Sequence, residues 1–184
     1  MTVLGVGPVV TSHPDDDLFG EALPALALPP ELGVFLDMPS FRQDLHTQPT
    51  LRDARCWHLA RRQRTDVLGI NRPWGRDTRL VRVAETATWT ELRSLRQAEQ
   101  VTTRVIECSS LGNLERSGPL PDVFVLGQWL LYRFVTEGGI PVGVVRYSDP
   151  DLVRVWTSVL RRLHRHGEPV NTYLDWHVPS KGLA

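Results

Sequence analysis

Arginine and tryptophan cluster in one part of this sequence, and the cluster indicates a binding surface. Eight arginines lie between residues 55 and 82, and Trp57 and Trp74 lie among them. Guanidinium groups contact phosphates and aromatic rings stack on bases, so segment 52–82 is a candidate nucleic-acid surface. We predict these contacts: Arg55, Arg61, Arg62, Arg64, Arg72, Trp74 and Arg76. We expect Trp74, in the sequence Arg-Pro-Trp-Gly-Arg, to be the most exposed of them.

The charge of the chain is unevenly distributed. Residues 1–51 carry seven acids and one base, a net −6, residues 52–104 carry twelve bases and six acids, a net +6, and the remainder is neutral. With 21 basic and 21 acidic side chains, the whole chain is not an electrostatic binder of nucleic acid or anionic lipid. Either the basic middle is free to bind a partner, or the acidic N-terminal arm folds onto it.

A metal site is the contrasting hypothesis. Ser12-His13-Pro14-Asp15-Asp16-Asp17 is similar to the His-Pro-Asp-Asp zinc motif of LmbE-type sugar deacetylases. An open zinc site activates water, and a zinc hydrolase using His13 and Asp16 is therefore one alternative. The other interpretation is that Ser12 or Asp15 caps a short helix over residues 15–22, where the helix dipole favours acids.

Cysteine and the remaining histidines offer little chemistry. Two cysteines are too few for a disulfide framework or a thiolate zinc site. We expect Cys56-Trp57-His58 to pack in the core, since a C-x-H pair on a helix points to two faces. His164 and His166 suit the negative end of a helix dipole. We predict no catalytic residue, no metal site and no cofactor.

The elements that position these residues alternate between helix and strand. Leu51, Ala54 and Leu59 have helical spacing, and Asp149-Pro150 is a typical helix start. The pattern predicts a helix over 50–63, strands over 65–70 and 80–83, a helix after Thr88 with Glu91 at capping-box spacing, a strand over 101–108, a hairpin of 122–126 and 128–135 bent at Gly127, a strand over 142–146 and a helix from 149 to near Gly167.

The chain ends differ from this regular middle. Residues 1 to about 45 are rich in proline and glycine and lack a long period, which favours a loosely structured arm. The sequence predicts an arm over 1–47, an α/β domain over 48–168 and a tail over 169–184. The apolar N-terminus lacks the basic start and cleavage site of a signal peptide. Prolines interrupt the longest apolar stretch, residues 23–36, so we expect a cytoplasmic protein with no membrane partner.

The middle of the chain resembles a known family. Residues from about 51 to 170 are similar to the phospholipase D-like domain of TrmB-type and related transcription regulators. The resemblance rests on five stretches: Arg-Thr-Asp-Val-Leu-Gly-Ile-Asn-Arg-Pro-Trp (64–74), Leu-Val-Arg-Val (80–83), residues 101–108, Val-Phe-Val-Leu-Gly-Gln-Trp-Leu-Leu-Tyr-Arg-Phe (123–134) and Val-Arg-Tyr-Ser-Asp-Pro-Asp-Leu-Val (145–153). The resemblance implies an α/β fold, the phospholipase D-like half, with a mixed sheet of about six strands flanked by helices.

The chain lacks the residues that catalysis requires in the active enzymes of that fold. Active phospholipase D enzymes use His-x-Lys followed by Asp, with the histidine as nucleophile. The single lysine here is Lys181, and residues 101–135 contain no histidine. Residues 1–50 are too rich in proline for a helix-turn-helix segment. The resemblance therefore implies a degenerate, non-catalytic domain that senses a ligand, dimerises or binds a partner.

The chain contains more large aromatic residues than a small α/β layer must bury. They are Trp129, Tyr132, Phe134, Trp156, Tyr173 and Trp176. Either they form a thick core, or some lie in a homodimer interface. The sequence thus favours a non-catalytic regulatory or binding module that self-associates, with nucleic-acid binding through residues 52–82 and zinc hydrolysis as alternatives.

Overall fold

The computed structural model describes residues 26–48, 54–61, 77–84, 89–98, 101–138 and 140–177. Its elements, in chain order, are η1 (Pro30–Leu32), β1 (Val34–Asp37), α1 (Met38–Thr47), β2 (Arg55–Ala60), β3 (Asp77–Val83), α2 (Trp89–Arg96), β4 (Val101–Ile106), η4 (Cys108–Leu111), β5 (Val123–Leu126), β6 (Leu130–Glu137), β7 (Ile140–Tyr147), α3 (Pro150–His166), β8 (Glu168–Pro169) and α4 (Val170–His177).

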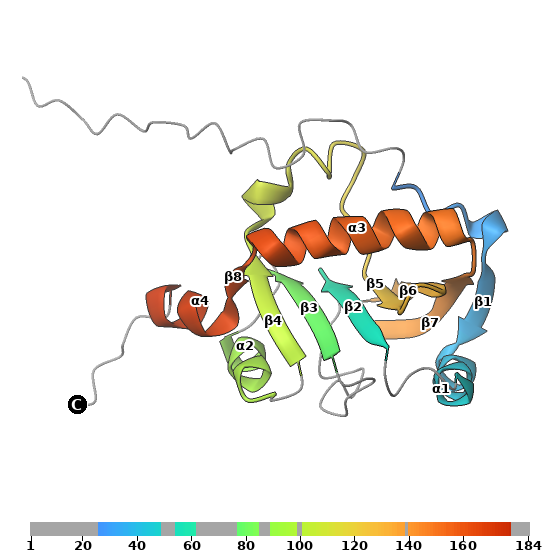
Figure 1. The fold of residues 1–184 in the computed structure, drawn as a ribbon, viewed down its shortest axis with the longest axis horizontal. Coiled ribbons are helices and arrows are strands. Elements are labelled where there is room, and N and C mark those ends of the chain that lie inside the picture. The colour runs from blue at the N-terminus through green and yellow to red at the C-terminus, as the bar shows by residue number, and fades with distance from the viewer. Residues whose placement is uncertain are drawn as a thin grey trace, which may run out of the picture.

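The strands form one mixed, open sheet, as the fold prediction expects (Figure 1). The eight strands lie in the order β1-β7-β6-β5-β2-β3-β4-β8. Strands β2, β3 and β4 are parallel neighbours, and the other pairings are antiparallel. Five of the eight match predicted strands. The other three are β1 in the predicted arm, β2 in the predicted helix over 50–63, and β8 at the boundary between the predicted domain and tail.

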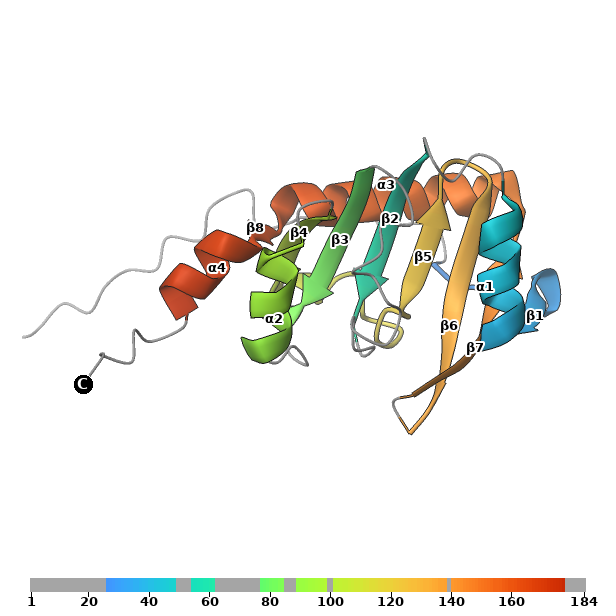
Figure 2. The ribbon, with the colours of Figure 1, turned by 90° about the horizontal axis from the view of Figure 1, so that it is seen from below.

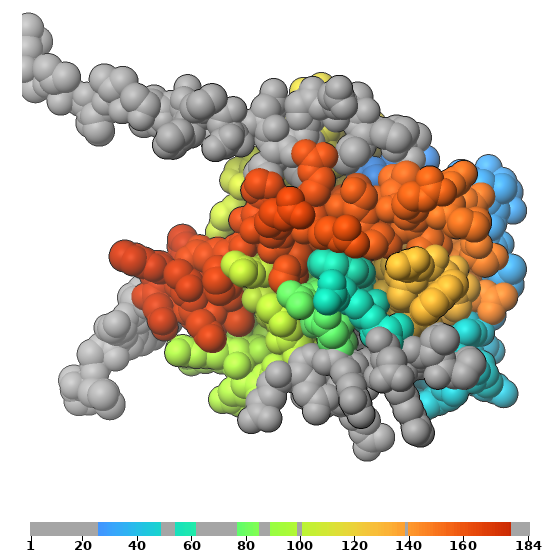
Figure 3. Space-filling view, in the orientation of Figure 1, coloured from blue at the N-terminus to red at the C-terminus, as the bar shows by residue number. Residues whose placement is uncertain are grey.

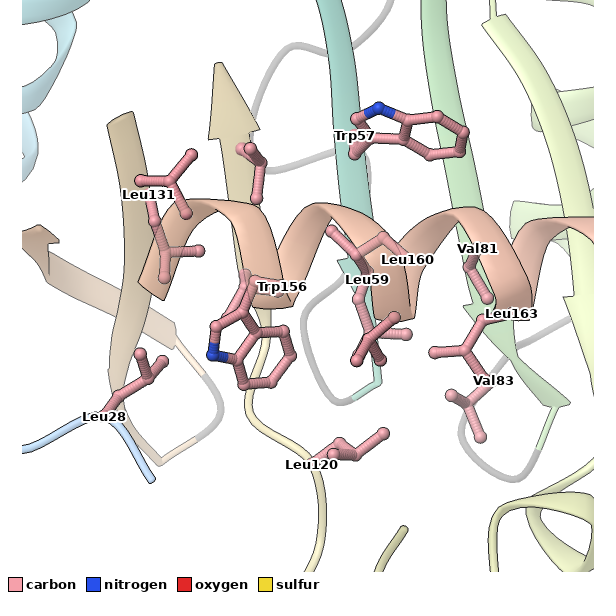
Figure 4. Close-up of a cluster of buried hydrophobic side chains, with 14 of the residues drawn as sticks. Leu28, Trp57, Leu59, Val81, Val83, Leu120, Leu131, Trp156, Leu160 and Leu163 are labelled. Atoms are coloured by element: carbon pink, nitrogen blue, oxygen red, sulfur yellow. The ribbon is translucent and has the colours of Figure 1, made fainter. Parts of the chain in front are cut away.

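Helix α3 covers one face of the sheet, which we call the α3 face. Asp149 caps the helix by accepting bonds from the backbone N–H groups of Asp151 and Leu152. Trp156, Leu160 and Leu163 then point at the strands, where they meet alternate residues of β2, β3, β5, β6 and β7, as Figure 4 shows. The period of about 3.6 residues in the helix and of about two residues in the strands places the apolar side chains of both at this contact.

Three shorter helices cover the opposite face of the sheet (Figure 2). Phe41 and Leu45 of α1 pack on residues of β5, β6 and β7. Helices α2 and α4 share a second cluster with β3 and β4, to which Leu92 and Tyr173 belong. Since both faces are covered, the middle strands are buried on both sides.

The predicted helix over residues 50–63 is wrong where the structure describes that segment. Residues 55–60 form strand β2, and from Cys56 to Ala60 every side chain is buried. A central strand with both faces covered has a continuous apolar run instead of alternation. Together with Leu51 and Ala54, that run has the residue spacing expected for the apolar face of a helix.

The described parts of the arm, residues 26–47, and of the tail, residues 169–177, are more regular than the sequence indicates. Asp37 accepts a bond from the Ser40 backbone N–H, and with Pro39 in the first turn this begins α1. In the tail, Pro169 precedes α4, and Val170, Tyr173 and Leu174 have helical spacing and are buried. Both helices are short, and their two-turn patterns are easily overlooked beside nearby prolines.

The two edges of the sheet differ. At one edge β8 is a two-residue strand that ends in Pro169 and leads directly into α4. At the other, β1 pairs with β7, and Val34 and Phe35 are exposed. Gly143 makes that pairing possible, because a Cβ there would lie 2.5 Å from the Leu36 carbonyl oxygen.

The remaining predicted elements are confirmed or lie outside the description. Strands β3, β4 and β7, helices α2 and α3, and the hairpin of β5 and β6 occur where expected, and Gly127 bends the hairpin at a positive φ of 59°. The predicted helix over 15–22, the strand over 65–70 and the cap Thr88 lie outside the described residues. No helix among the described ranges is long and apolar enough to cross a membrane.

Candidate nucleic-acid interface

Two of the seven predicted contact residues lie in the described part of the chain. Arg55 begins β2 on the surface, whereas Arg61 follows β2 and is buried. Arg62, Arg64, Arg72, Trp74 and Arg76 lie outside the described residues. The predicted surface as a whole therefore stays a prediction, and the described arginines show what their neighbours do.

Arg55 and Arg79 share one carboxylate at the start of β2 and β3. Arg55 Nε lies 2.5 Å from Asp77 Oδ2, and Arg79 Nε lies 2.7 Å from Asp77 Oδ1. Partial burial of Asp77 acts to raise its pKa, but the hydrogen bonds and charges of Arg79 and Arg55 outweigh it and hold the pKa below its usual range. Two cations on one anion leave a local excess of positive charge.

Arg61 is part of a buried ion pair. Its guanidinium lies 3.0 Å from Glu115 Oε2 and 3.6 Å from Cys108 Sγ, and its backbone N–H donates to Asp122 Oδ1 at 2.5 Å. This cluster connects the end of β2 to the segment between β4 and β5. Arg61 stabilises the fold and does not present its charge to solvent.

Arg82 is fully buried, and all three of its guanidinium nitrogens donate hydrogen bonds. Its Nε and Nη2 donate to the two carboxylate oxygens of Glu91 in α2 at 3.0 and 3.1 Å. Its Nη1 donates to the carbonyl oxygens of Ala60 and Arg61, both at 2.8 Å. Arg79 and Arg82 point to opposite faces of the sheet, as the sequence predicts.

The acidic arm does not neutralise the basic middle through Asp44. Asp44 of α1 accepts bonds from Tyr132 and from Arg146, which belong to the C-terminal part of the chain. Asp77, Glu91 and Glu115 neutralise arginines of the basic middle instead.

The solvent face of α3 is a basic surface that the sequence analysis did not identify. Arg154, Ser158, Arg161 and Arg165 are all exposed. Their spacing of four, three and four residues places them on one side of the helix, opposite Trp156 and Leu163. Figure 3 shows α3 as a ridge across this side of the molecule. The helical period alone could have revealed this arginine face.

The arginine face is only lightly neutralised. Arg154 contacts Asp151 one turn earlier, and both side chains are exposed, which makes such a pair weak. Among the residues that the structure describes, Arg161 and Arg165 form no ion pair. Their guanidinium groups are available to an anion.

The two histidines at the end of α3 differ in setting. His166 is exposed, beside the arginine face. His164 is buried, its Nε2 lies 3.1 Å from the Thr102 carbonyl oxygen, and its ring packs edge-on against Trp57. Burial lowers the pKa of His164. The expectation that both histidines lie as cations at the negative end of the helix dipole is therefore wrong for His164, which belongs to the core, while His166 lies exposed at that end of α3.

Cys56 and His58 pack in the core, as expected, although they lie on a strand. Residues two apart on a strand share a face, and both side chains are buried toward α1. Burial raises the pKa of Cys56 to about 12 and lowers that of His58 to about 3. His13 and Asp16 lie outside the described residues, within which no cluster of three metal-ligating side chains occurs.

Comparisons with known proteins show structural likeness at low sequence identity and no sequence relative. No family model matches the chain, and no curated protein matches it. A solved structure of TrmBL2, described as an archaeal chromatin protein with a novel mode of DNA binding, aligns with a TM-score of 0.44 and 7% identity. The alignment covers 78% of this chain and 55% of that one, so this chain spans about half the length of TrmBL2.

Proposed function

We propose that this protein is a non-catalytic regulatory module that binds nucleic acid through the arginine face of α3. The observation that carries the proposal is the exposure of Arg154, Arg161 and Arg165 on one side of a single rigid helix. From Arg154 to Arg165 the helix rises about 17 Å, which is enough to contact several phosphates of a strand. Arginine binds phosphate in a bidentate geometry.

We propose that the protein is non-catalytic because of the side chains that occupy the carboxyl ends of the parallel strands. Ligands of α/β sheets commonly bind at such ends. Here Arg61 with Glu115 and Arg82 with Glu91 fill the ends of β2 and β3 as buried ion pairs. Charged groups that are committed to each other are poor acids, bases and nucleophiles.

The regulatory role and self-association complete the proposal. The resemblance of residues 51–170 to the effector domains of TrmB-type regulators supports a regulatory role. Of the six surplus aromatic residues, four are buried and two, Trp129 and Trp176, are exposed. Trp129, in the β5–β6 hairpin, is the member of the surplus that we assign to an interface between copies.

The test is the salt dependence of binding to labelled single- and double-stranded oligonucleotides, measured by fluorescence anisotropy between about 50 and 200 mM salt. We expect the variant with Arg161→Ala and Arg165→Ala to bind every sequence more weakly, with a salt slope smaller by about two, one for each lost phosphate contact. Arg42→Ala is the matched control, since Arg42 is exposed on α1, on the opposite face.

Two further readouts on the same samples separate the parts of the proposal. Intact oligonucleotide after prolonged incubation is expected, and cleavage would contradict the non-catalytic role. The mass of the protein in solution reports self-association. If the wild-type protein shows no salt-dependent binding, or if Arg42→Ala weakens binding as much as the α3 variant does, the arginine face is not the interface.

A further inference from the structure

Three aromatic rings form a stack where α2 meets α4. The rings of Trp89 and Tyr173 have centroids 6.4 Å apart and an interplanar angle of 30°. The rings of Tyr173 and His177 are closer, at 4.3 Å and 23°. Rings stacked at such angles face one another, so the outer faces of the stack belong to Trp89 and His177.

Both outer rings of the stack are open to solvent: Trp89 is 45% exposed and His177 is also exposed, whereas Tyr173 between them is buried. Trp176, the residue before His177 in α4, is 80% exposed. We call Trp89, Tyr173, Trp176 and His177 the aromatic platform. Tryptophan is seldom this exposed, and two such residues on adjacent helices indicate a binding surface.

The fold holds the platform in place. Leu92 and Leu95 of α2 pack in one cluster with Val170 and Leu174 of α4. The Tyr173 hydroxyl donates to Glu107 Oε1 at 2.7 Å, and burial with this bond raises the pKa of Tyr173 to about 12. The middle ring is therefore fixed and uncharged at neutral pH, and the platform loses little entropy on binding.

Positive charge lies beside the platform on two sides. Arg93 and Arg96 of α2 are exposed, and the pair of Arg96 with Asp175 is long, at 3.4 Å, and exposed on both sides. On the other side, Arg165 lies in the last turn of α3, which joins α4 through Gly167 and the two residues of β8. Figure 3 shows α4 beyond the C-terminal end of α3.

We infer that the aromatic platform stacks the unpaired bases of a single-stranded nucleic acid whose phosphates contact the arginine face of α3. Aromatic rings bordered by cations are complementary to bases bordered by phosphates, and stacking tolerates any base because each has a flat face. This inference rests on the proposed function and adds to it that single strands bind better than duplexes, whose bases are already stacked.

The experiment compares three probes of equal length: oligothymidine, the same backbone without bases, and a duplex. The variant is Trp176→Ala, because the exposed side chain contributes little to folding. We expect it to weaken oligothymidine binding about tenfold, a typical cost of one lost stacking contact, and to leave binding of the abasic backbone unchanged. Ile140→Ala is the control, because Ile140 is exposed at the start of β7, away from α2 and α4.

The outcomes distinguish this inference from the proposed function. If Trp176→Ala and the α3 variant with Arg161→Ala and Arg165→Ala each weaken oligothymidine binding, both stand. If only the α3 variant does, the phosphate interface stands and the stacking inference is overturned. Equal loss with the abasic backbone also overturns stacking. If Trp176→Ala instead lowers the mass in solution without changing binding, the platform is an interface between two copies and stacking is overturned. No binding by the wild-type protein overturns both.

Discussion

His58 is the residue whose burial has the clearest measurable effect. Its imidazole is 1% exposed and packs against the rings of Phe124 and Phe134, and its Nε2 has no hydrogen-bond partner among the described residues. Burial and, secondarily, the charge of Arg82 lower its pKa to about 3. The folded protein therefore keeps this side chain neutral where an unfolded chain would protonate it.

The consequence is a loss of stability in acid. The unfolded chain binds a proton at His58 below the ordinary histidine pKa of 6.5, and the folded chain does not until about pH 3. The free energy of unfolding should therefore fall as the pH drops through this window, by up to about 1.4 kcal/mol per pH unit from this group. We expect His58→Leu to flatten the decline, measured by urea unfolding at several pH values.

The control for this prediction is His166→Gln, which changes an exposed histidine on α3. It should keep the slope of the wild-type protein. Part of the slope should persist in His58→Leu, because burial also lowers the pKa of His164. Identical slopes in His58→Leu and the wild-type protein would show that His58 does not control acid stability.

At the scale of elements, the ion pair of Arg82 and Glu91 joins α2 to β3 inside the protein. Removing one member of a buried pair leaves the other charge unpaired, and the expected cost is about 3 to 5 kcal/mol. Glu91→Ala should therefore lower the free energy of unfolding by this amount in chemical denaturation. Replacing both members, as Arg82→Met with Glu91→Leu, should recover much of the loss.

Arg93→Ala provides the matched control on the same helix. Arg93 is exposed, and its removal should change stability by no more than about 0.5 kcal/mol. A cost for Glu91→Ala as small as that for Arg93→Ala would mean that the pair contributes little, and that α2 depends on Leu92 and Leu95 instead.

The elements also show which parts of the fold the sequence could predict. Strand β4 and helix α3 carry clear periods, and Asp149 caps α3, so both were predictable. Strand β5 is a short apolar run, and Gly127 after it marks the hairpin. Strand β2 was not, since burial on both faces removes the alternation that identifies a strand. Helices α1 and α4 depend on one or two turns of apolar spacing, which tertiary packing reinforces and local sequence does not.

The predicted surface over residues 52–82 stays a prediction, and the arginine face of α3 could have been found from the helical period. Counting arginines along the chain draws attention to residues 55–82, but Arg61 and Arg82 there are interior ion-pair members. Sequence density cannot distinguish an arginine that faces a glutamate from one that faces solvent. The arginines of α3 are more widely spaced, and their common direction follows from the helical period once Trp156 and Leu163 are assigned to the core.

For the whole molecule, α3 connects both halves of the sheet. Trp156 is fully buried in a cluster that includes residues of β2, β3, β5, β6 and β7. Trp156→Ala should cost about 3 to 5 kcal/mol, as large-to-small changes in cores do. Because the cluster spans the sheet, the whole sheet should unfold in one step. The far- and near-ultraviolet circular dichroism signals should therefore change in the same transition, in the wild-type protein and in Trp156→Ala alike.

Trp176→Ala is the suitable comparison, since it removes the same side chain from an exposed position. Its transition should lie close to that of the wild-type protein. Separate transitions for the two signals in Trp156→Ala would indicate that the halves of the sheet fold independently.

The unequal edges of the sheet limit how copies of the molecule could add to one another. In the described structure, the β8 edge is two residues long, contains Pro169, which has no N–H to donate, and continues directly into α4. The β1 edge is longer and carries exposed Val34 and Phe35. Each chain thus offers, within the described ranges, a single edge to which another strand could pair. Any growth by strand addition through β1 stops after one step, so this geometry allows a closed pair and does not allow a filament.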